Sequence, residues 1–171
     1  HQLESIAAQW SGWSELAMET TYFDTESSSL SSKKYTLRRR LENGTYICAL
    51  KTPGEENVRG EWETECDRIE DALSVLVDMG APEELLELTR EGLQEVCGAS
   101  FPRIAKTLVM PEGVLELALD QGVLSNGEKE APFAELEIEL KHGYREEVQV
   151  MGHLLAAAYE LEVENKSKFQ R

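Results

Sequence analysis

The chain has 171 residues, of which 41% are hydrophobic and 29% charged, and its formal net charge is −16. This length fits a single domain over 1–171, and no apolar run approaches the roughly 18 residues that a membrane span needs. The negative charge argues against nucleic acid or an anionic membrane as a partner. The cysteines Cys48, Cys66 and Cys97 form no C-x-x-C pair, which predicts reduced thiols in a cytoplasmic protein rather than disulfides or a zinc site.

The hydrophobic periodicity predicts an α+β protein in which helices are inserted between groups of antiparallel strands. In chain order, we expect a helix over Leu3–Trp10, strands over Thr20–Thr25, Tyr35–Leu41, Thr45–Lys51 and Val58–Glu65, helices over Asp67–Met79 and Glu83–Cys97, strands over Phe101–Met110, Val114–Gln121 and Phe133–Lys141, and a helix over Tyr144–Tyr159. Asn43-Gly44 predicts a hairpin turn, because both residues tolerate positive φ, and Asp67 can cap the helix that follows it.

Positive charge is concentrated in one part of this acidic chain. The segment from Lys33 to Arg59 holds seven basic residues and three acidic ones. Such a segment suggests a confined site for a small anion, and the alternative, which composition alone favours, is a solvated pair of strands.

The predicted strand Phe133–Lys141 separates its charges from its apolar side chains. Since side chains alternate along a strand, Glu135, Glu137, Glu139 and Lys141 share one face, and the leucine and isoleucine side chains between them share the other. Asp120 and Glu116 are placed in the same way on the preceding strand. Adjacent like charges repel, so three glutamates on one face need water, cations or facing basic groups.

Two arrangements satisfy this requirement. In the first, the sheet is open, its apolar face lies under the helices, and its charged face is solvated. In the second, the sheet closes into a barrel with a charged interior and the helices coat the outside. Carboxylates on one wall would then hold Mg²⁺ or Mn²⁺, and arginine and lysine side chains on another would bind phosphate.

An ordered set of short motifs covers nearly the whole chain. The motifs are Tyr22-Phe23-Asp24-Thr25, Leu37-Arg38-Arg39-Arg40, Leu50-Lys51, Arg59-Gly60-Glu61-Trp62-Glu63, LELALDQG over 115–122, FAELEIELKHG over 133–143, and Ser167-Lys168-Phe169-Gln170-Arg171. Together they resemble the signatures of the CYTH domain family, the triphosphate tunnel metalloenzymes, in the order of that family. The last three motifs are most similar to the bacterial inorganic triphosphatase branch.

The resemblance implies an antiparallel, eight-stranded closed β-barrel, or tunnel, with a charged interior and helices packed outside. It also implies roles for individual residues. Metal ligands would be Asp120, Glu135, Glu137 and Glu139; groups that contact the substrate would be Arg38, Arg40, Lys51, Arg59, Glu61, Glu63, Lys106 and Arg171; and the catalytic groups would be Glu137 and Lys168. Lys168 matches the lysine of a C-terminal helix that closes one end of the tunnel.

The activity that the resemblance implies is Mg²⁺- or Mn²⁺-dependent hydrolysis of inorganic triphosphate to pyrophosphate and phosphate. Three alternatives stay open: hydrolysis of thiamine or nucleoside triphosphates, an adenylate cyclase reaction, and a polyphosphate-binding module without catalysis. The expected partner is a small phosphate anion, and the oligomeric state and a fused C-terminal domain in the native protein are left open. The N-terminal E-x-E-x-K strand of the family is absent from the printed sequence, so we expect either a trimmed start or a member that lacks this strand.

Overall fold

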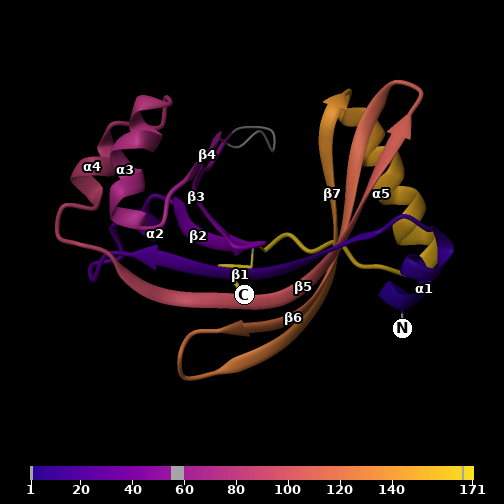
Figure 1. The fold of residues 1–171 in the computed structure, drawn as a ribbon, viewed down its shortest axis with the longest axis horizontal. Coiled ribbons are helices and arrows are strands. Elements are labelled where there is room, and N and C mark those ends of the chain that lie inside the picture. The colour runs from indigo at the N-terminus through magenta and orange to yellow at the C-terminus, as the bar shows by residue number, and fades with distance from the viewer. Residues whose placement is uncertain (1, 55–59, 167) are drawn as a thin grey trace. The chain divides into compact units, whose positions relative to one another are not determined.

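The computed structural model describes residues 2–54, 60–166 and 168–171. Helices and strands follow one another in the order α1 Gln2–Gln9, β1 Ser14–Asp24, α2 Ser29–Ser32, β2 Thr36–Glu42, β3 Thr45–Thr52, β4 Gly60–Glu65, α3 Ile69–Asp78, α4 Glu84–Leu88, β5 Gln94–Met110, β6 Gly113–Ser125, β7 Glu130–Gly143 and α5 Arg145–Tyr159 (Figure 1). None of the helices in this part of the chain has the length and hydropathy of a membrane-spanning helix.

The described strands form one seven-stranded sheet in the order β4-β3-β2-β1-β5-β6-β7. The pairings from β1 to β4 are antiparallel, and β5, β6 and β7 are joined by connections of two and four residues, which only antiparallel neighbours allow. The α+β class and the antiparallel sheet are confirmed. The expectation of eight strands in a closed barrel is wrong for the described residues, because β4 and β7 are the two ends of this order.

Contacts within the chain divide it into two compact units. Unit 1 comprises His1–Ala17, Phe101–Val123 and Pro132–Arg171, and unit 2 comprises Met18–Ser100 and Leu124–Ala131. Four strands, β1, β5, β6 and β7, continue from one unit into the other.

The core of unit 2 lies between the strands and the helices α2, α3 and α4 (Figure 1). Helix α3 packs an apolar stripe into this core, since Ile69, Ala72 and Leu76 are all buried. The predicted hairpin is confirmed as well, with Asn43 at φ 49° and Gly44 at φ 82°. This turn sets the register of β2 against β3, so alternation along β2 places Arg38 and Arg40 on one face and Arg39 on the other.

Two predictions in unit 2 are wrong. The helix expected over Glu83–Cys97 ends at Leu88, and β5 begins at Gln94. Between these two elements, Gly92 takes φ 99°, which a helix does not allow, and the chain then continues as a strand. Asp67 does not cap α3, because the N-cap residue is Arg68 and it makes no side-chain cap; the carbonyl of Asp67 instead accepts a hydrogen bond from Arg39 at 2.9 Å.

Unit 1 packs α1 and α5 with its parts of the strands. Ile6 of α1, Leu155 of α5 and the β6 side chains Leu115 and Leu117 are buried. A Cβ built on Gly152 of α5 would contact Ile138 Cδ1 of β7 at 3.8 Å, so this helix lies against β7 (Figure 1).

The start of β6 and the end of β7 approach each other closely in unit 1. A Cβ on Gly113 would lie 2.6 Å from the carbonyl oxygen of His142, and a Cβ on Gly143 would meet the carbonyl oxygen of Glu112. Glycine is required at both positions, because any side chain would collide with backbone atoms.

Candidate functional site

Three acidic side chains of unit 1 meet between β6 and β7. Asp120, Glu135 and Glu137 each offer a carboxylate oxygen, and these oxygens all lie within 4.8 Å of one another. We call this group the carboxylate cluster. Alternation along β7 brings Glu135 and Glu137 to the same face, as the sequence predicts, and the pairing of β6 with β7 adds Asp120.

Arg103 of β5 binds this cluster from a buried position. Its Nε donates to Asp120 Oδ1 at 2.7 Å, and its Nη2 donates to Asp120 Oδ2 at 2.7 Å and to Glu137 Oε2 at 3.0 Å. The side chain of Asp120 is fully buried and that of Arg103 is 9% exposed. A two-point bond of this kind fixes the plane of the carboxylate as well as its charge.

These partners keep the guanidinium group of Arg103 protonated. Burial by itself lowers the pKa of the guanidinium, but the hydrogen bond to Asp120 and the negative charges of Glu137 and Asp120 outweigh burial and hold the pKa above its ordinary value. Arg103 is therefore a permanent cation at the cluster.

Lys168 places its ammonium group where all three carboxylates meet. Its Nζ lies 3.1 Å from Asp120 Oδ2 and 2.6 Å from Glu137 Oε1, and it also pairs with Glu135. The neighbouring Arg171 pairs with the second oxygen of Glu135. Residues 168–170 form a turn rather than the C-terminal helix that the family resemblance implies.

Two aromatic rings complete the surroundings of these cations. Phe101 of β5 and Phe133 of β7 meet edge to face, with ring centroids 5.4 Å apart. The Nζ atom of Lys168 lies 5.1 Å from the centroid of Phe101 and 5.4 Å from that of Phe133. Arg103 and Arg171 each lie 5.8 Å from one of the two rings. The rings add cation–π attraction to these cations.

The donor chemistry of the carboxylate cluster fits a hard divalent cation. Mg²⁺ and Mn²⁺ prefer carboxylate oxygens, and three such oxygens converge here from two strands. The position that these oxygens share already holds a cation in this structure, the ammonium group of Lys168. Asp120, Glu135 and Glu137 therefore form a cation site by geometry as well as by residue type.

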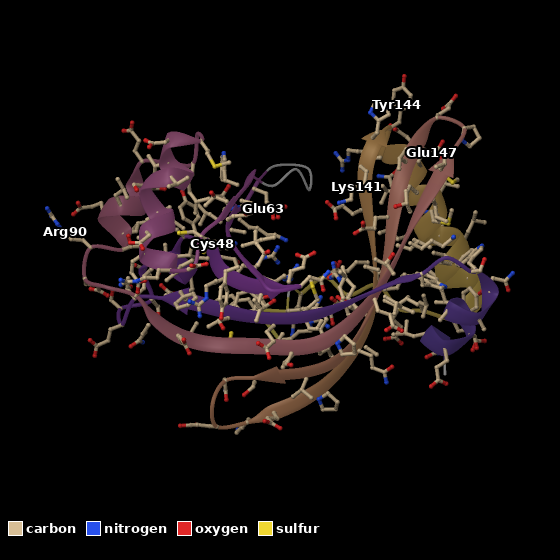
Figure 2. All side chains as sticks on the ribbon, in the orientation of Figure 1. Cys48, Glu63, Arg90, Lys141, Tyr144 and Glu147 are labelled. Carbon is tan, nitrogen blue, oxygen red and sulfur yellow. The ribbon has the colours of Figure 1, made fainter. Side chains whose placement is uncertain are left out.

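Glu139 does not belong to this group in the structure. It lies on the same face of β7 but pairs with Lys141 at 3.2 Å, and both side chains are exposed, at 62% for Glu139 and 44% for Lys141. Lys141 is labelled in Figure 2. The exposed fraction on this face rises along β7 from 13% at Glu135 to 44% at Glu137 and to 62% at Glu139. The predicted metal ligands are thus brought together at Asp120, Glu135 and Glu137, and Glu139 lies outside their cluster.

In unit 2, the predicted phosphate-binding residues form a second group. We call Arg38, Arg40 and Lys51 the basic group. Nη2 of Arg38 and Nζ of Lys51 both lie 3.8 Å from Glu61 Oε1, and Nε of Arg40 donates to the hydroxyl of Thr20 at 2.9 Å. β2 and β3 therefore place these three cations on one face of the sheet, and Arg38 and Lys51 share Glu61 of β4 as a counter-ion.

Arg38 carries the strongest sign of an anion site in unit 2. Its side chain is 13% exposed, and its Nε is buried without a hydrogen-bond partner among the described residues. A buried donor without a partner is costly, and an anion oxygen would satisfy it. Burial raises the pKa of the adjacent Tyr22 hydroxyl, and the positive charges of Arg38 and Arg40 oppose that rise.

Two further predicted substrate residues, Glu63 and Lys106, are described in the structure. Glu63 is exposed on β4, two residues from Glu61 (Figure 2). Lys106 donates to the carbonyl of Ser11 at 2.5 Å, and its odd spacing from Arg103 puts the two side chains on opposite faces of β5. Arg59 lies outside the described residues.

The sequence prediction missed Arg103 as a site residue. Its separation of 17 residues from Asp120 and 34 from Glu137 gives no local signal. The signal that could have found it is its spacing along the strand. Arg103 is two residues from Phe101 and from Ala105, so it shares a strand face with these two side chains, which are both buried. A charged side chain on a buried face needs a partner of opposite charge.

Asp24 of the Tyr-Phe-Asp-Thr motif has a structural role. Its carboxylate accepts hydrogen bonds from the backbone N–H groups of Thr25, Leu30 and Ser31, at 2.8, 3.0 and 3.1 Å. It thereby ties the end of β1 to α2.

Comparison with known proteins places these residues in a family. The inorganic triphosphatase of Haemophilus influenzae is 28% identical over 130 residues, which are 75% of this chain and 37% of that protein. The chain therefore spans little more than a third of the length of this curated relative.

Solved structures show the same fold at low sequence identity. A Pyrococcus horikoshii protein matches with a TM-score of 0.65 and 19% identity, over 99% of this chain and 90% of that one. HpAC1 from Hippeastrum, for which a dominant triphosphatase activity is described, matches with a TM-score of 0.60 and 20% identity, over 98% and 86% of the two chains. The CYTH domain family itself matches residues 2–171, so that the whole described chain is covered. The chain belongs to the CYTH domain family.

Proposed function

We propose that this protein hydrolyses inorganic triphosphate to pyrophosphate and phosphate with the help of Mg²⁺ or Mn²⁺. The observation that carries the proposal is the carboxylate cluster, whose three oxygens converge on one cation position. In a CYTH family member, a cation site of this kind suits the binding of a polyphosphate. The triphosphatase relatives support this reaction among those catalysed on the fold.

Asp120, Glu135 and Glu137 would hold the divalent cation, which supplies charge neutralisation of the phosphoryl oxygens when bound. Arg103 keeps Asp120 oriented through a two-point bond and Glu137 through a single hydrogen bond. Glu137 is the most exposed of the three, at 44%, and we assign it the orientation of the attacking water. The ammonium group of Lys168 is suited to donating a hydrogen bond to a phosphoryl oxygen.

We assign the binding of the phosphate chain to the basic group. A triphosphate carries about four negative charges, so most of the work of catalysis is positioning and neutralisation. The buried Nε of Arg38, which lacks a partner among the described residues, supports this assignment. The remaining predicted contacts of the substrate are Arg59, Lys106, Arg171, Glu61 and Glu63. The proposed partner is a small phosphate anion rather than nucleic acid.

The test is release of phosphate from tripolyphosphate with and without Mg²⁺ or Mn²⁺, with ATP and thiamine triphosphate as comparison substrates. Metal-dependent release that is fastest with tripolyphosphate is the expected result. Faster turnover of ATP or thiamine triphosphate would make that compound, rather than inorganic triphosphate, the substrate. Production of cyclic AMP from ATP would identify a cyclase reaction instead of hydrolysis. Tight tripolyphosphate binding without release would identify a binding module instead.

A further inference from the structure

The C-terminal segment 168–171 supplies two of the three cations at the carboxylate cluster. Lys168 touches all three carboxylates, and Arg171 pairs with Glu135. The side chains of Lys168 and Arg171 are 5% and 17% exposed, so both are held within unit 1. The third cation, Arg103, comes from β5.

The charges of this arrangement balance. Three carboxylates face three cations, and the two cations of segment 168–171 together carry the charge of one divalent ion. A divalent ion added while Lys168 and Arg171 stayed in place would give the cluster a surplus of two positive charges. It would also compete with the Lys168 ammonium for the same oxygens, and like charges a few ångström apart repel strongly in a buried site.

We propose that segment 168–171 and a divalent cation are alternative occupants of the carboxylate cluster, so that binding of the cation displaces Lys168 and Arg171. This inference rests on the part of the proposed function that places a divalent cation at Asp120, Glu135 and Glu137. With the cation in place of the segment, the cluster is neutral again and the side chain of Lys168 is exposed.

The structure also indicates why the segment is the part that moves. Arg103 is held on β5, between β1 and β6 in the sheet, and binds Asp120 with two hydrogen bonds of 2.7 Å. Residues 168–171 belong to no helix or strand. Release of this segment breaks no pairing between strands, whereas release of Arg103 would leave the fully buried carboxylate of Asp120 without its two-point partner.

The first experiment measures the exposure of Lys168 in the unaltered protein. An amine-reactive ester is applied without tripolyphosphate, at increasing Mn²⁺, and labelling of each lysine is measured by mass spectrometry. Lys168 should react slowly without the ion and at least five-fold faster at saturation. Lys166, which is exposed and lies two residues away, is the internal control and should not change. Equal labelling of Lys168 with and without bound Mn²⁺ overturns the inference.

The second experiment compares Lys168→Met with the matched variant Lys166→Met by calorimetric titration with Mn²⁺ alone. Lys168→Met removes the competing ammonium and should bind Mn²⁺ at least ten-fold more tightly than the unaltered protein, whereas Lys166→Met should bind it equally. Equal or weaker binding by Lys168→Met overturns the inference and makes Lys168 an aid to metal binding.

The outcomes separate this inference from the proposed function. Competition between Mn²⁺ and Lys168 without any phosphate release would sustain the inference and reject the hydrolase. Metal-dependent phosphate release while Lys168 stays protected from labelling would support the hydrolase and reject the inference. Failure of the unaltered protein and of Lys168→Met to bind Mn²⁺ would reject both.

Discussion

At the scale of single residues, each charge at the carboxylate cluster depends on a partner from another element. Asp120 is fully buried, yet it is bound by Arg103 of β5 and by Lys168 near the C-terminus. A buried ion pair adds little net stability, but removal of one partner leaves a buried charge and is costly. Removing one partner of such a pair should therefore cost more stability than removing both.

Arg103→Met should lower the free energy of unfolding by about 3 kcal/mol, because it leaves the buried carboxylate of Asp120 without its two-point partner. The measurement is urea unfolding at neutral pH. Adding Asp120→Asn to the same chain should restore part of the loss, since the uncompensated charge is then gone. A single variant as stable as the unaltered protein would contradict the buried pair.

Glu137→Gln should abolish most metal-dependent phosphate release, with a fall in kcat of roughly 100-fold or more, because the divalent cation loses one of its negatively charged ligands. The fold should persist, since this side chain is 44% exposed. Phosphate release and circular dichroism measure the two effects, and Glu146→Gln on the exposed first turn of α5 is the control. Unchanged turnover would remove Glu137 from the metal site.

Arg38→Ala should weaken tripolyphosphate binding by about 1.5–3 kcal/mol, the contribution of a hydrogen bond to a charged group. The buried Nε of Arg38 is the donor that we expect the anion to satisfy. Calorimetric titration with tripolyphosphate in the absence of metal measures this change. Arg68→Ala, an exposed arginine of the same unit, should leave the affinity unchanged, and an equal effect of both variants would indicate only long-range attraction.

At the scale of elements, local sequence predicts strands and turns well and helix length less well. The Asn43-Gly44 turn is confirmed because two residues that accept positive φ determine it. The acidic helix predicted over Glu83–Cys97 is about three times as long as the five-residue helix observed, because the same polar segment is compatible with a helix face and with a strand. Its C-terminal part becomes β5 through pairing with distant strands, which periodicity does not contain.

Two glycines should respond in opposite ways to alanine. Gly152→Ala should raise the free energy of unfolding by about 0.5–1 kcal/mol, because it lies inside α5 and its nearest neighbour is 3.8 Å away. Gly113→Ala should lower it by about 1–3 kcal/mol, because the new methyl group would lie 2.6 Å from the carbonyl oxygen of His142. Thermal and urea unfolding of both variants measures the effects, and a destabilised Gly152→Ala would contradict the packing of α5.

At the scale of the whole molecule, the two units differ in chemistry. Unit 1 gathers the carboxylates and their cations, and unit 2 holds the basic group and all three cysteines. Burial raises the pKa of Cys48 to about 12 and that of Cys97 to about 11. The stability of unit 2 should therefore change with pH in the alkaline range.

The free energy of unfolding should fall as pH rises above 9 towards 11. In this range the thiols of the unfolded chain lose their protons near the ordinary pKa of 9.0, whereas the folded chain keeps them. Because the unfolded state then binds fewer protons, its stability relative to the folded state increases. Urea unfolding under reducing conditions at pH 8 and 10.5 tests this, and the double variant Cys48→Ala, Cys97→Ala should show a smaller fall.

Much of the candidate site was predictable from the sequence because it depends on alternation along single strands. Glu135 and Glu137 share a face of β7, and Arg38 and Arg40 share a face of β2, since neighbouring side chains point to opposite sides. The same rule put Lys106 and Arg103 on opposite faces of β5. It could not decide how far the acidic face of β7 extends, and Glu139 proved to be paired with Lys141 outside the cluster.

The sequence by itself determined the strand faces, the Asn-Gly hairpin and the family, because each is encoded in residues close together or in an ordered set of motifs. Only the tertiary structure decided that Arg103 binds Asp120 and Glu137 and that Lys168 occupies the cation position of the cluster. These contacts join residues 17 to 48 positions apart in the chain. Their partners are selected by the pairing of strands and by the need to neutralise buried charge, and both depend on the folded chain as a whole.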